Sequence, residues 1–297
     1  MSLIWILIIA AVIIIAAICI EIYRETHNFC VTRFSVHSKK MDDLEDDKIK
    51  IIFLSDLHNK EYGEKNERLL RAIRQTFPDL ILIGGDMLVG KEKASYGPAL
   101  SFVESLTAFC PVIYANGNHE QRMKEEPEKY SSSYKEYRRL LRSKGVLFLE
   151  NGSTQVKVHG KKIRISGLEL PLETYRKFRK EHVDGGTVEE CLGFVPRERA
   201  DRDYQILLAH NPAYMDAYKE WGADLILSGH LHGGIARIPG IGGVISPQAF
   251  LFPKYSGEMT TEGEQTIIVS RGLGSHTINI RLFNMPEVIL IELKKSL

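Results

Sequence analysis

Residues 225–234 read LILSGHLHGG, an apolar run that ends in two histidines one residue apart, with glycines on both sides. The run predicts a buried strand. Alternate residues of an extended chain point to opposite sides, so His230 and His232 can face one site only where the chain turns, as glycine allows. The pair alone favours a metal site only modestly. Its meaning depends on whether other strands end in the same way.

Four other apolar runs, at 49–55, 79–85, 111–116 and 204–210, also end in side chains that can bind a metal. Taken singly, each of these side chains could cap a turn or be an ordinary loop histidine. Five such coincidences are improbable, and oxygen and imidazole ligands suit Mn, Fe or Zn. The sequence therefore predicts a metal site formed by side chains at the five strand ends, residues 55–58, 84–86, 116–120, 209–212 and 228–232.

Amphipathic stretches at 64–76, 98–108, 133–145 and 212–221 predict helices between the strands. Residues 153–167 predict a hairpin, and 265–272 and 287–293 predict two further strands. Alternation of strand and helix predicts a layered α/β fold. In such sheets ligands bind at the carboxyl ends of the strands, where the metal-capable residues fall.

The N-terminal segment 3–20 contains only apolar residues and one cysteine. As a helix it would be about 27 Å long, close to a hydrocarbon layer of about 30 Å. A retained single-pass anchor is favoured over a buried core helix. It is also favoured over a cleaved signal peptide, because no basic residue precedes the run and no small-residue cleavage site closes it.

These features divide the chain into an anchor at 1–22, a stalk or linker with some early strand at 23–48, and a domain at 49–297 that carries the strand-end motifs. Basic residues follow the anchor at Arg24, Arg33, Lys39 and Lys40. They favour a cell-membrane protein whose C-terminal domain lies on the cytoplasmic side.

Composition excludes several classes of protein. The net charge of +1 and the lack of a basic run near the motifs argue against a nucleic-acid partner and against a DNA nuclease. The four cysteines show no paired spacing, which argues against a disulfide framework or a thiolate zinc site.

The motifs SDLH, GGDM, GNHE, LLAHNP and SGHLHGG resemble, in order and approximate spacing, those of calcineurin-like metallophosphoesterases. The resemblance covers residues 49–293 and implies a four-layer αββα sandwich with two divalent transition metal ions, Mn, Fe or Zn. The C-terminal segment is similar to a bacterial membrane-anchored branch. Some members of that branch resemble enzymes that cleave UDP-2,3-diacylglucosamine.

The resemblance also implies roles for individual residues. One metal would take Asp56, His58, Asp86 and His232, and the other would take Asp86, Asn118, His210 and His230. His119 would face the substrate and not a metal. Two positions depart from the family pattern, because Glu120 replaces the usual Asp and His276 stands where a small residue is expected.

The implied reaction is hydrolysis of a phosphoester or pyrophosphate bond. Two divalent cations, two aspartates and a bridging hydroxide leave a small net positive charge that suits a phosphate anion. His119 would donate a proton to the leaving group. Glu120 could orient a histidine or simply begin a helix, and Arg271 could bind a phosphate oxygen or form an ordinary salt bridge.

The anchor makes a lipid-linked phosphate one candidate substrate, beside nucleotides, phosphoproteins and cell-wall phosphodiesters. The alternative is an interaction module of the same fold that has no turnover. The sequence leaves the oligomeric state open.

Overall fold

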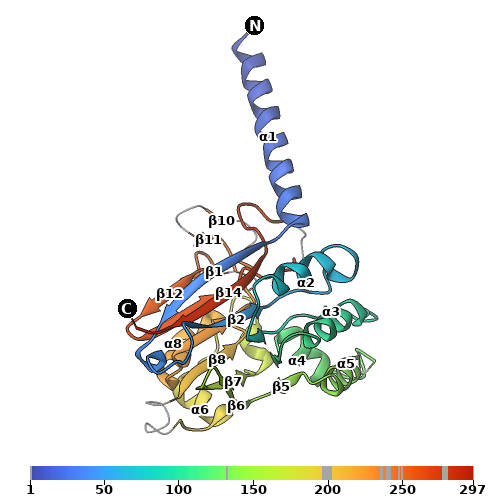
Figure 1. Cartoon of the computed structure of the whole chain (residues 1–297). Coiled ribbons are helices and arrows are strands. Elements are labelled where there is room, and N and C mark those ends of the chain that lie inside the picture. Colours follow the sequence, from blue (N-terminus) through green and yellow to red (C-terminus); the bar gives the residue numbers. More distant parts are fainter. Residues whose placement is uncertain are drawn as a thin grey trace.

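The computed structural model describes residues 2–131, 133–195, 203–234, 237–238, 242–246, 248, 250–275 and 280–296. Two six-stranded sheets face each other, with helices on their outer faces (Figure 1). This confirms the predicted α/β sandwich. The N-terminal helix projects away from the sandwich as a single rod.

The first sheet has the order β1–β14–β2–β3–β4–β5. Its strands are β1 (Cys30–His37), β14 (Glu287–Lys294), β2 (Lys48–Leu54), β3 (Leu80–Ile83), β4 (Val112–Ala115) and β5 (Leu147–Leu149). Strands β2 to β5 are mutually parallel. Strand β14 runs antiparallel to β2, and β1 runs parallel to β14.

The second sheet has the order β12–β13–β9–β8–β7–β6. Its strands are β12 (Met259–Glu262), β13 (Gln265–Val269), β9 (Leu225–Ser228), β8 (Tyr204–Ala209), β7 (Lys161–Leu168) and β6 (Gly152–Val158). The four central strands are parallel. The antiparallel pair β6–β7 is the predicted hairpin, and a short separate pair joins β10 (Arg237–Ile238) to β11 (Gly242–Gly243).

Alternating side chains of the central strands fill two different layers. In β2, Ile51 and Phe53 point into the core between the sheets, while Ile52 and Leu54 pack against helices. The first sheet is covered by α2 (Glu67–Arg74), α3 (Gly97–Thr107), α4 (Asn118–Glu125) and α5 (Ser133–Ser143), and the second by α6 (Gly185–Leu192) and α8 (Met215–Trp221). Burial on both faces explains why these strands read as continuous apolar runs.

The structure differs from the stalk that the sequence predicts over 23–48. The chain is helical up to His27, and β1 begins three residues later and pairs along its whole length with β14. The acidic stretch before Lys48 contains the buried side chains of Met41 and Leu44. The sequence predicts some early strand here but not its place in the sandwich, because one face of β1 is largely exposed and its residues alternate between apolar and polar.

Helix α1 (Leu3–His27) has the length and composition of a membrane span, and within the described part of the chain no other helix does. Its most apolar 18-residue window is not buried against the protein. The helix is therefore not part of the core, one of the alternatives for this segment.

Strand β1 should contribute to stability. A chain that begins at Lys48 loses the buried side chains of Val36, Met41 and Leu44. Compared with a chain that begins at Asn28, we expect its free energy of unfolding to be lower by at least about 4 kcal/mol, at about 1.5–3 kcal/mol for each buried side chain. Urea denaturation followed by circular dichroism measures the difference. Equal midpoints with equal slopes would contradict the place of β1 in the fold.

Candidate metal centre

The carboxyl ends of β2, β3, β4, β8 and β9 meet at one edge of the sandwich, as the sequence predicts. Three groups of potential ligand atoms lie there, each with its atoms within 4.8 Å of one another. The groups are Asp56 with His58 and His232, Asp86 with His58 and His119, and Asp86 with His210 and His230.

Asp86 lies at the middle of the cluster. Its Oδ1 accepts a hydrogen bond of 2.8 Å from the backbone N–H of His119. Its Oδ2 lies 3.2 Å from His210 Nε2 and 3.8 Å from His58 Nε2. One carboxylate oxygen is thus held by the backbone, while the other faces histidines on two sides.

Asp56 is also fully buried, and its carboxylate accepts the backbone N–H of His230 and the hydroxyl of Ser55. Asp56 Oδ1 lies 3.4 Å from His232 Nε2. Gly229 allows this approach, because a Cβ atom at this position would lie 1.9 Å from Ser55 Oγ and 2.5 Å from Asp56 Oδ2. The glycine of the GHLHGG motif therefore lets the β9 loop reach the β2 loop.

Backbone carbonyls fix the ring orientation of three histidines. The Nδ1 atoms of His58, His210 and His232 lie 3.2, 2.6 and 3.2 Å from the carbonyl oxygens of Leu88, Gly84 and Gly274. A carbonyl can only accept, so each Nδ1 carries a hydrogen and each Nε2 is directed at the cluster. The Nε2 atoms of His58 and His232 face each other at 3.1 Å, an arrangement that a cation between them would stabilise.

His119 has the opposite tautomer. Its Nδ1 accepts a hydrogen bond of 2.8 Å from the backbone N–H of Gly90, so Nε2 carries the hydrogen. That Nε2 lies 3.9 Å from Asp86 Oδ2, close to the cluster. A ring with this tautomer can donate a proton but offers no lone pair to a metal, which separates His119 from the other histidines.

The residues at the centre share an unusual backbone conformation. Asp56, His58, Asp86, His230 and His232 all have φ between 49° and 67°, the left-handed region that residues other than glycine rarely adopt. Such conformations cost about 1–3 kcal/mol each and cluster at functional sites. The chain holds these residues in place through the backbone hydrogen bonds of neighbouring loops.

The buried charges shift the pKa values strongly. Burial and the neighbouring Asp86 raise the pKa of Asp56 to about 6. Burial also acts to raise the pKa of Asp86, but His210 and His119 outweigh it and hold that pKa well below its usual value. Burial acts to lower the pKa of His210, but Asp86 and Asp56 outweigh it and raise that pKa to about 10. The two aspartates thus require positive charge beside them, which divalent cations can supply.

Asn118 completes the set at the start of α4. Its Oδ1 is buried and has no hydrogen-bond partner among the described residues. An amide oxygen in that position would otherwise cost free energy, and a metal ion would satisfy it. Together with the histidine rings directed at the cluster, it makes the site suitable for divalent cations.

Glu120 is buried. Its carboxylate accepts hydrogen bonds from the N–H groups of Asp86, Leu88 and Gly117 and from the hydroxyl of Tyr114. Burial, followed by the charge of Asp86, raises its pKa to about 7. Glu120 therefore fixes the loop that carries Asp86 to the loop that carries Asn118.

Arg271 lies outside the cluster. Its Nη2 is 2.5 Å from Glu287 Oε2 and 3.1 Å from Thr32 Oγ1. The structure therefore places it in the salt bridge that the sequence left open as an alternative to phosphate binding. His276 lies outside the described residues.

Asn284 and Arg281 stabilise the loops of the centre, and neither residue belongs to a strand-end motif. Asn284 Nδ2 donates to the carbonyl oxygens of His232 and Gly234. The buried guanidinium of Arg281 donates to the carbonyl of Gly274, the group that also orients His232. These residues reach the centre only because the loop after β13 passes beside it. The residues at the strand ends therefore give no indication of them.

Comparison with known proteins agrees with this geometry. Residues 49–234 match the calcineurin-like phosphoesterase family. The phosphodiesterase YaeI of Escherichia coli is 26% identical over 247 residues, 82% of each chain. The uncharacterized metallophosphoesterase YkuE of Bacillus subtilis is 26% identical over 279 residues, 92% of this chain and 88% of the relative.

Among solved structures, the phosphopantetheinyl hydrolase of Mycobacterium tuberculosis covers 76% of this chain and 90% of its own, at 14% identity and a TM-score of 0.45. The family match covers more than half of the sequence. The chain belongs to the calcineurin-like phosphoesterase family. It is accordingly a phosphoester hydrolase, of a family that normally binds two divalent metal ions.

Asn284 provides a test of the support around the centre. Asn284→Ala removes the donor to the carbonyls of His232 and Gly234, so we expect the affinity for one of two bound metal ions to fall about 10–100-fold. Equilibrium dialysis with Mn²⁺ and elemental analysis measure it. Asn151→Ala is the control, because Asn151 makes similar bonds to the backbone of Glu169, away from the cluster. Equal affinities in the two variants would contradict this role.

Proposed function

We propose that this protein is a membrane-anchored hydrolase that uses two divalent metal ions to cleave a phosphoester or pyrophosphate bond. The observation that carries the proposal is Asp86, a buried carboxylate with one oxygen fixed by the backbone and the other between histidines of two loops. Asp56, His58, Asp86 and His232 would hold one ion, and Asp86, Asn118, His210 and His230 the other. Bound divalent cations would activate water and neutralise phosphate oxygens.

The protein's own residues orient the metal ligands and supply a proton. The carbonyls of Leu88, Gly84 and Gly274 keep the Nε2 atoms of three histidines directed at the cluster. His119 holds a proton on Nε2 and would give it to the leaving oxygen, a contribution typically worth about 10²–10⁴-fold in rate. The N–H of Gly90 maintains that tautomer.

We further propose that α1 is retained as a single-pass anchor and that the substrate phosphate is lipid-linked. The length, apolarity and exposure of α1 support the anchor. An anchored enzyme meets lipid-linked phosphates at a high local concentration. The basic residues after the apolar segment favour a cytoplasmic domain.

The bridging role of Asp86 can be tested with Asp86→Asn. The change removes negative charge from between the two cations, so we expect hydrolysis of bis-p-nitrophenyl phosphate by the Mn²⁺-loaded protein to be lost. The chromogenic assay is read beside elemental analysis. Asp184→Asn, at the exposed start of α6, is a matched control that should retain full activity. Undiminished turnover with two ions bound would refute the bridging role.

His119 should act on the reaction and not on metal binding. In His119→Ala we expect two equivalents of metal to remain while kcat falls about 10²–10⁴-fold, as for the loss of a general acid. The defect should be smaller for substrates with better leaving groups, because these need no proton. A fall to one metal equivalent would show instead that His119 is a ligand.

A further inference from the structure

Helix α1 joins the sandwich at the edge that carries the metal ligands. The first residue of β1, Cys30, pairs with Glu287, the first residue of β14. Strand β14 runs antiparallel to β2, with Ile289 opposite Phe53. Strand β1 therefore begins where β2 ends, beside the loop of Asp56. The base of α1 and the metal centre lie on the same side of the molecule.

The last turn of α1 is bonded to the loops of the centre. Glu25 is buried and accepts the backbone N–H of Asn284, whose side chain holds the carbonyls of His232 and Gly234. On the other side, Lys60 Nζ donates to the carbonyl of Thr26. These contacts tie the helix to both ligand loops, so the direction of α1 fixes the direction of the catalytic edge.

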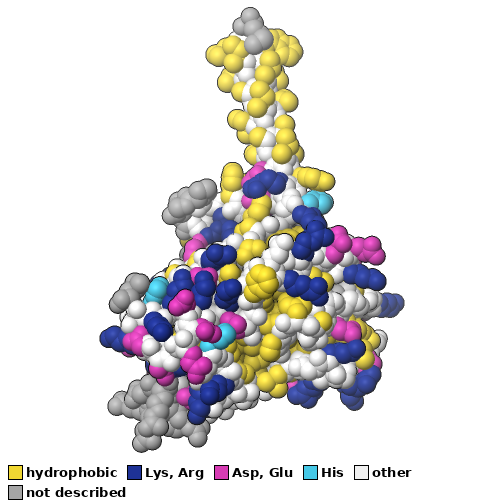
Figure 2. All heavy atoms as spheres, viewed as in Figure 1, with side chains coloured by type: hydrophobic (Ala, Val, Ile, Leu, Met, Phe, Trp, Pro, Cys, Tyr) yellow, Lys and Arg dark blue, Asp and Glu magenta, His cyan; other side chains and the backbone are white. Residues whose placement is uncertain are grey.

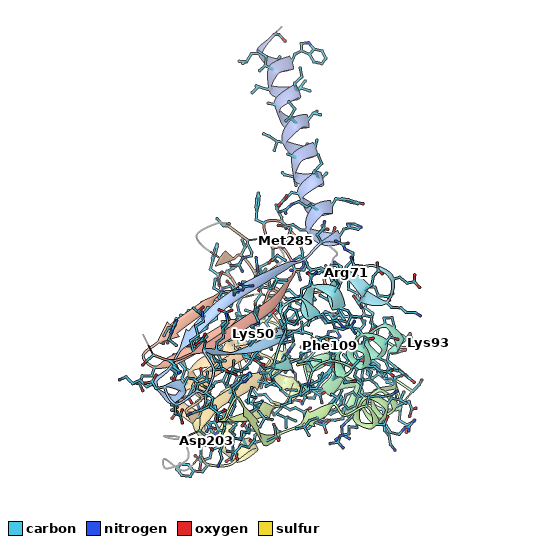
Figure 3. All side chains as sticks on the ribbon, viewed as in Figure 1. Lys50, Arg71, Lys93, Phe109, Asp203 and Met285 are labelled. Atoms are coloured by element: carbon cyan, nitrogen blue, oxygen red, sulfur yellow. The ribbon has the colours of Figure 1, made fainter. Side chains whose placement is uncertain are left out.

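Three apolar side chains are exposed beside this base. Phe283 is 54% exposed, Ile280 42% and Ile238 41%. Phe283 precedes Asn284, and the carbonyl of Leu282 accepts the backbone N–H of Arg237, so the two loops are in contact. We call Ile238, Ile280 and Phe283 the apolar rim. Figure 2 shows hydrophobic side chains next to the base of α1, and Figure 3 places Met285 there.

Phe283 is exposed, and its backbone conformation is energetically unfavourable. Its φ of 54° is left-handed, which is unfavourable for a bulky residue. Both neighbours are fixed, because Leu282 and Asn284 bond to Arg237 and Glu25. The exposed ring is thus carried between two hydrogen-bonded residues.

The depth of the rim matches the bilayer surface. The uncharged segment of α1 ends at Ile20. Glu25, which bonds to Asn284, lies five residues further, about 7–8 Å along the helix axis. The head-group layer on each side of a bilayer is about 5–8 Å thick. A side chain next to Asn284 thus lies at the height of the lipid head groups.

We propose that the apolar rim is a membrane-docking surface, which inserts into the head-group layer of the bilayer that α1 spans and holds the metal edge against the lipid. This rests on the proposed function, which takes α1 as an anchor. The partner is the lipid surface itself. The rim continues the apolar surface of α1, and apolar side chains at this depth bind the boundary between head groups and acyl chains.

The test uses tryptophan fluorescence of the full chain in phosphatidylcholine vesicles whose acyl chains carry bromine near the head group. Trp5 and Trp221 are replaced by Phe, and Phe283→Trp or Ile280→Trp provides the reporter. The matched control is Phe77→Trp, because Phe77 is also exposed and left-handed but precedes β3, at the opposite edge of the sheet. We expect brominated lipid to quench the rim reporters at least about twofold and to leave the control unchanged.

The same samples are assayed with bis-p-nitrophenyl phosphate, a soluble substrate. Rim reporters that are no more quenched than Phe77→Trp, or a chain that does not float with the vesicles, would overturn the docking surface. Turnover in such samples would still support the proposed hydrolase function. Quenched rim reporters support docking whether or not turnover is seen, while a lack of turnover counts against the proposed hydrolase alone.

Discussion

The burial of two carboxylates at one edge of the sandwich is the constraint around which the rest of the centre is arranged. Asp56 and Asp86 have almost no exposed surface. A buried charge is tolerable only when opposite charge or hydrogen bonds surround it. The backbone N–H groups of His119 and His230 supply some of that compensation. Burial acts to lower the pKa of His210, but the charges of Asp86 and Asp56 outweigh it and raise that pKa to about 10, and divalent cations would offset the same negative charge. The left-handed conformations of the loops around the aspartates are unfavourable. They are therefore stable only when these loops support one another.

The tautomers of the histidines follow from the same set of loops. A backbone carbonyl beside Nδ1 makes Nε2 a ligand, whereas a backbone N–H beside Nδ1 makes Nε2 a proton donor. His58 and His119 lie in the same cluster with ring centroids 4.7 Å apart, yet they receive opposite neighbours. The different roles of the two histidines are thus determined by the main chain of the loop at 88–90. This loop presents a carbonyl to His58 and an N–H to His119. No change in side-chain identity is needed to separate the roles.

Much of the fold was predictable because the central strands are buried on both faces and are followed by chemically distinctive residues. The helix predicted over 64–76 is shorter than expected, because Lys65 and Asn66 are left-handed and α2 begins only at Glu67. The sequence predicts some early strand within the stalk, but the place of β1 in the sandwich could not be predicted, since it depends on pairing with β14, far along the sequence. The grouping of the ligands was predictable from strand ends. The supports at Asn284, Arg281 and Glu120 depend on loop paths that local patterns do not determine. The assignment of ligands to individual metal ions stays a prediction.

The position of β1 has a consequence for the whole molecule. In a sandwich whose N-terminal strand ran parallel to β2, a helix preceding it would emerge at the amino ends of the strands, away from the metal centre. Here β14 reverses direction relative to β2, and β1 follows β14. The reversal brings the only helix of the described chain that is long and apolar enough to span a bilayer to the catalytic edge. Glu25 and Asn284 then join that helix to the loop of His232 by hydrogen bonds. The antiparallel insertion of β14 is therefore the feature of the topology that places the base of α1 beside the metal centre.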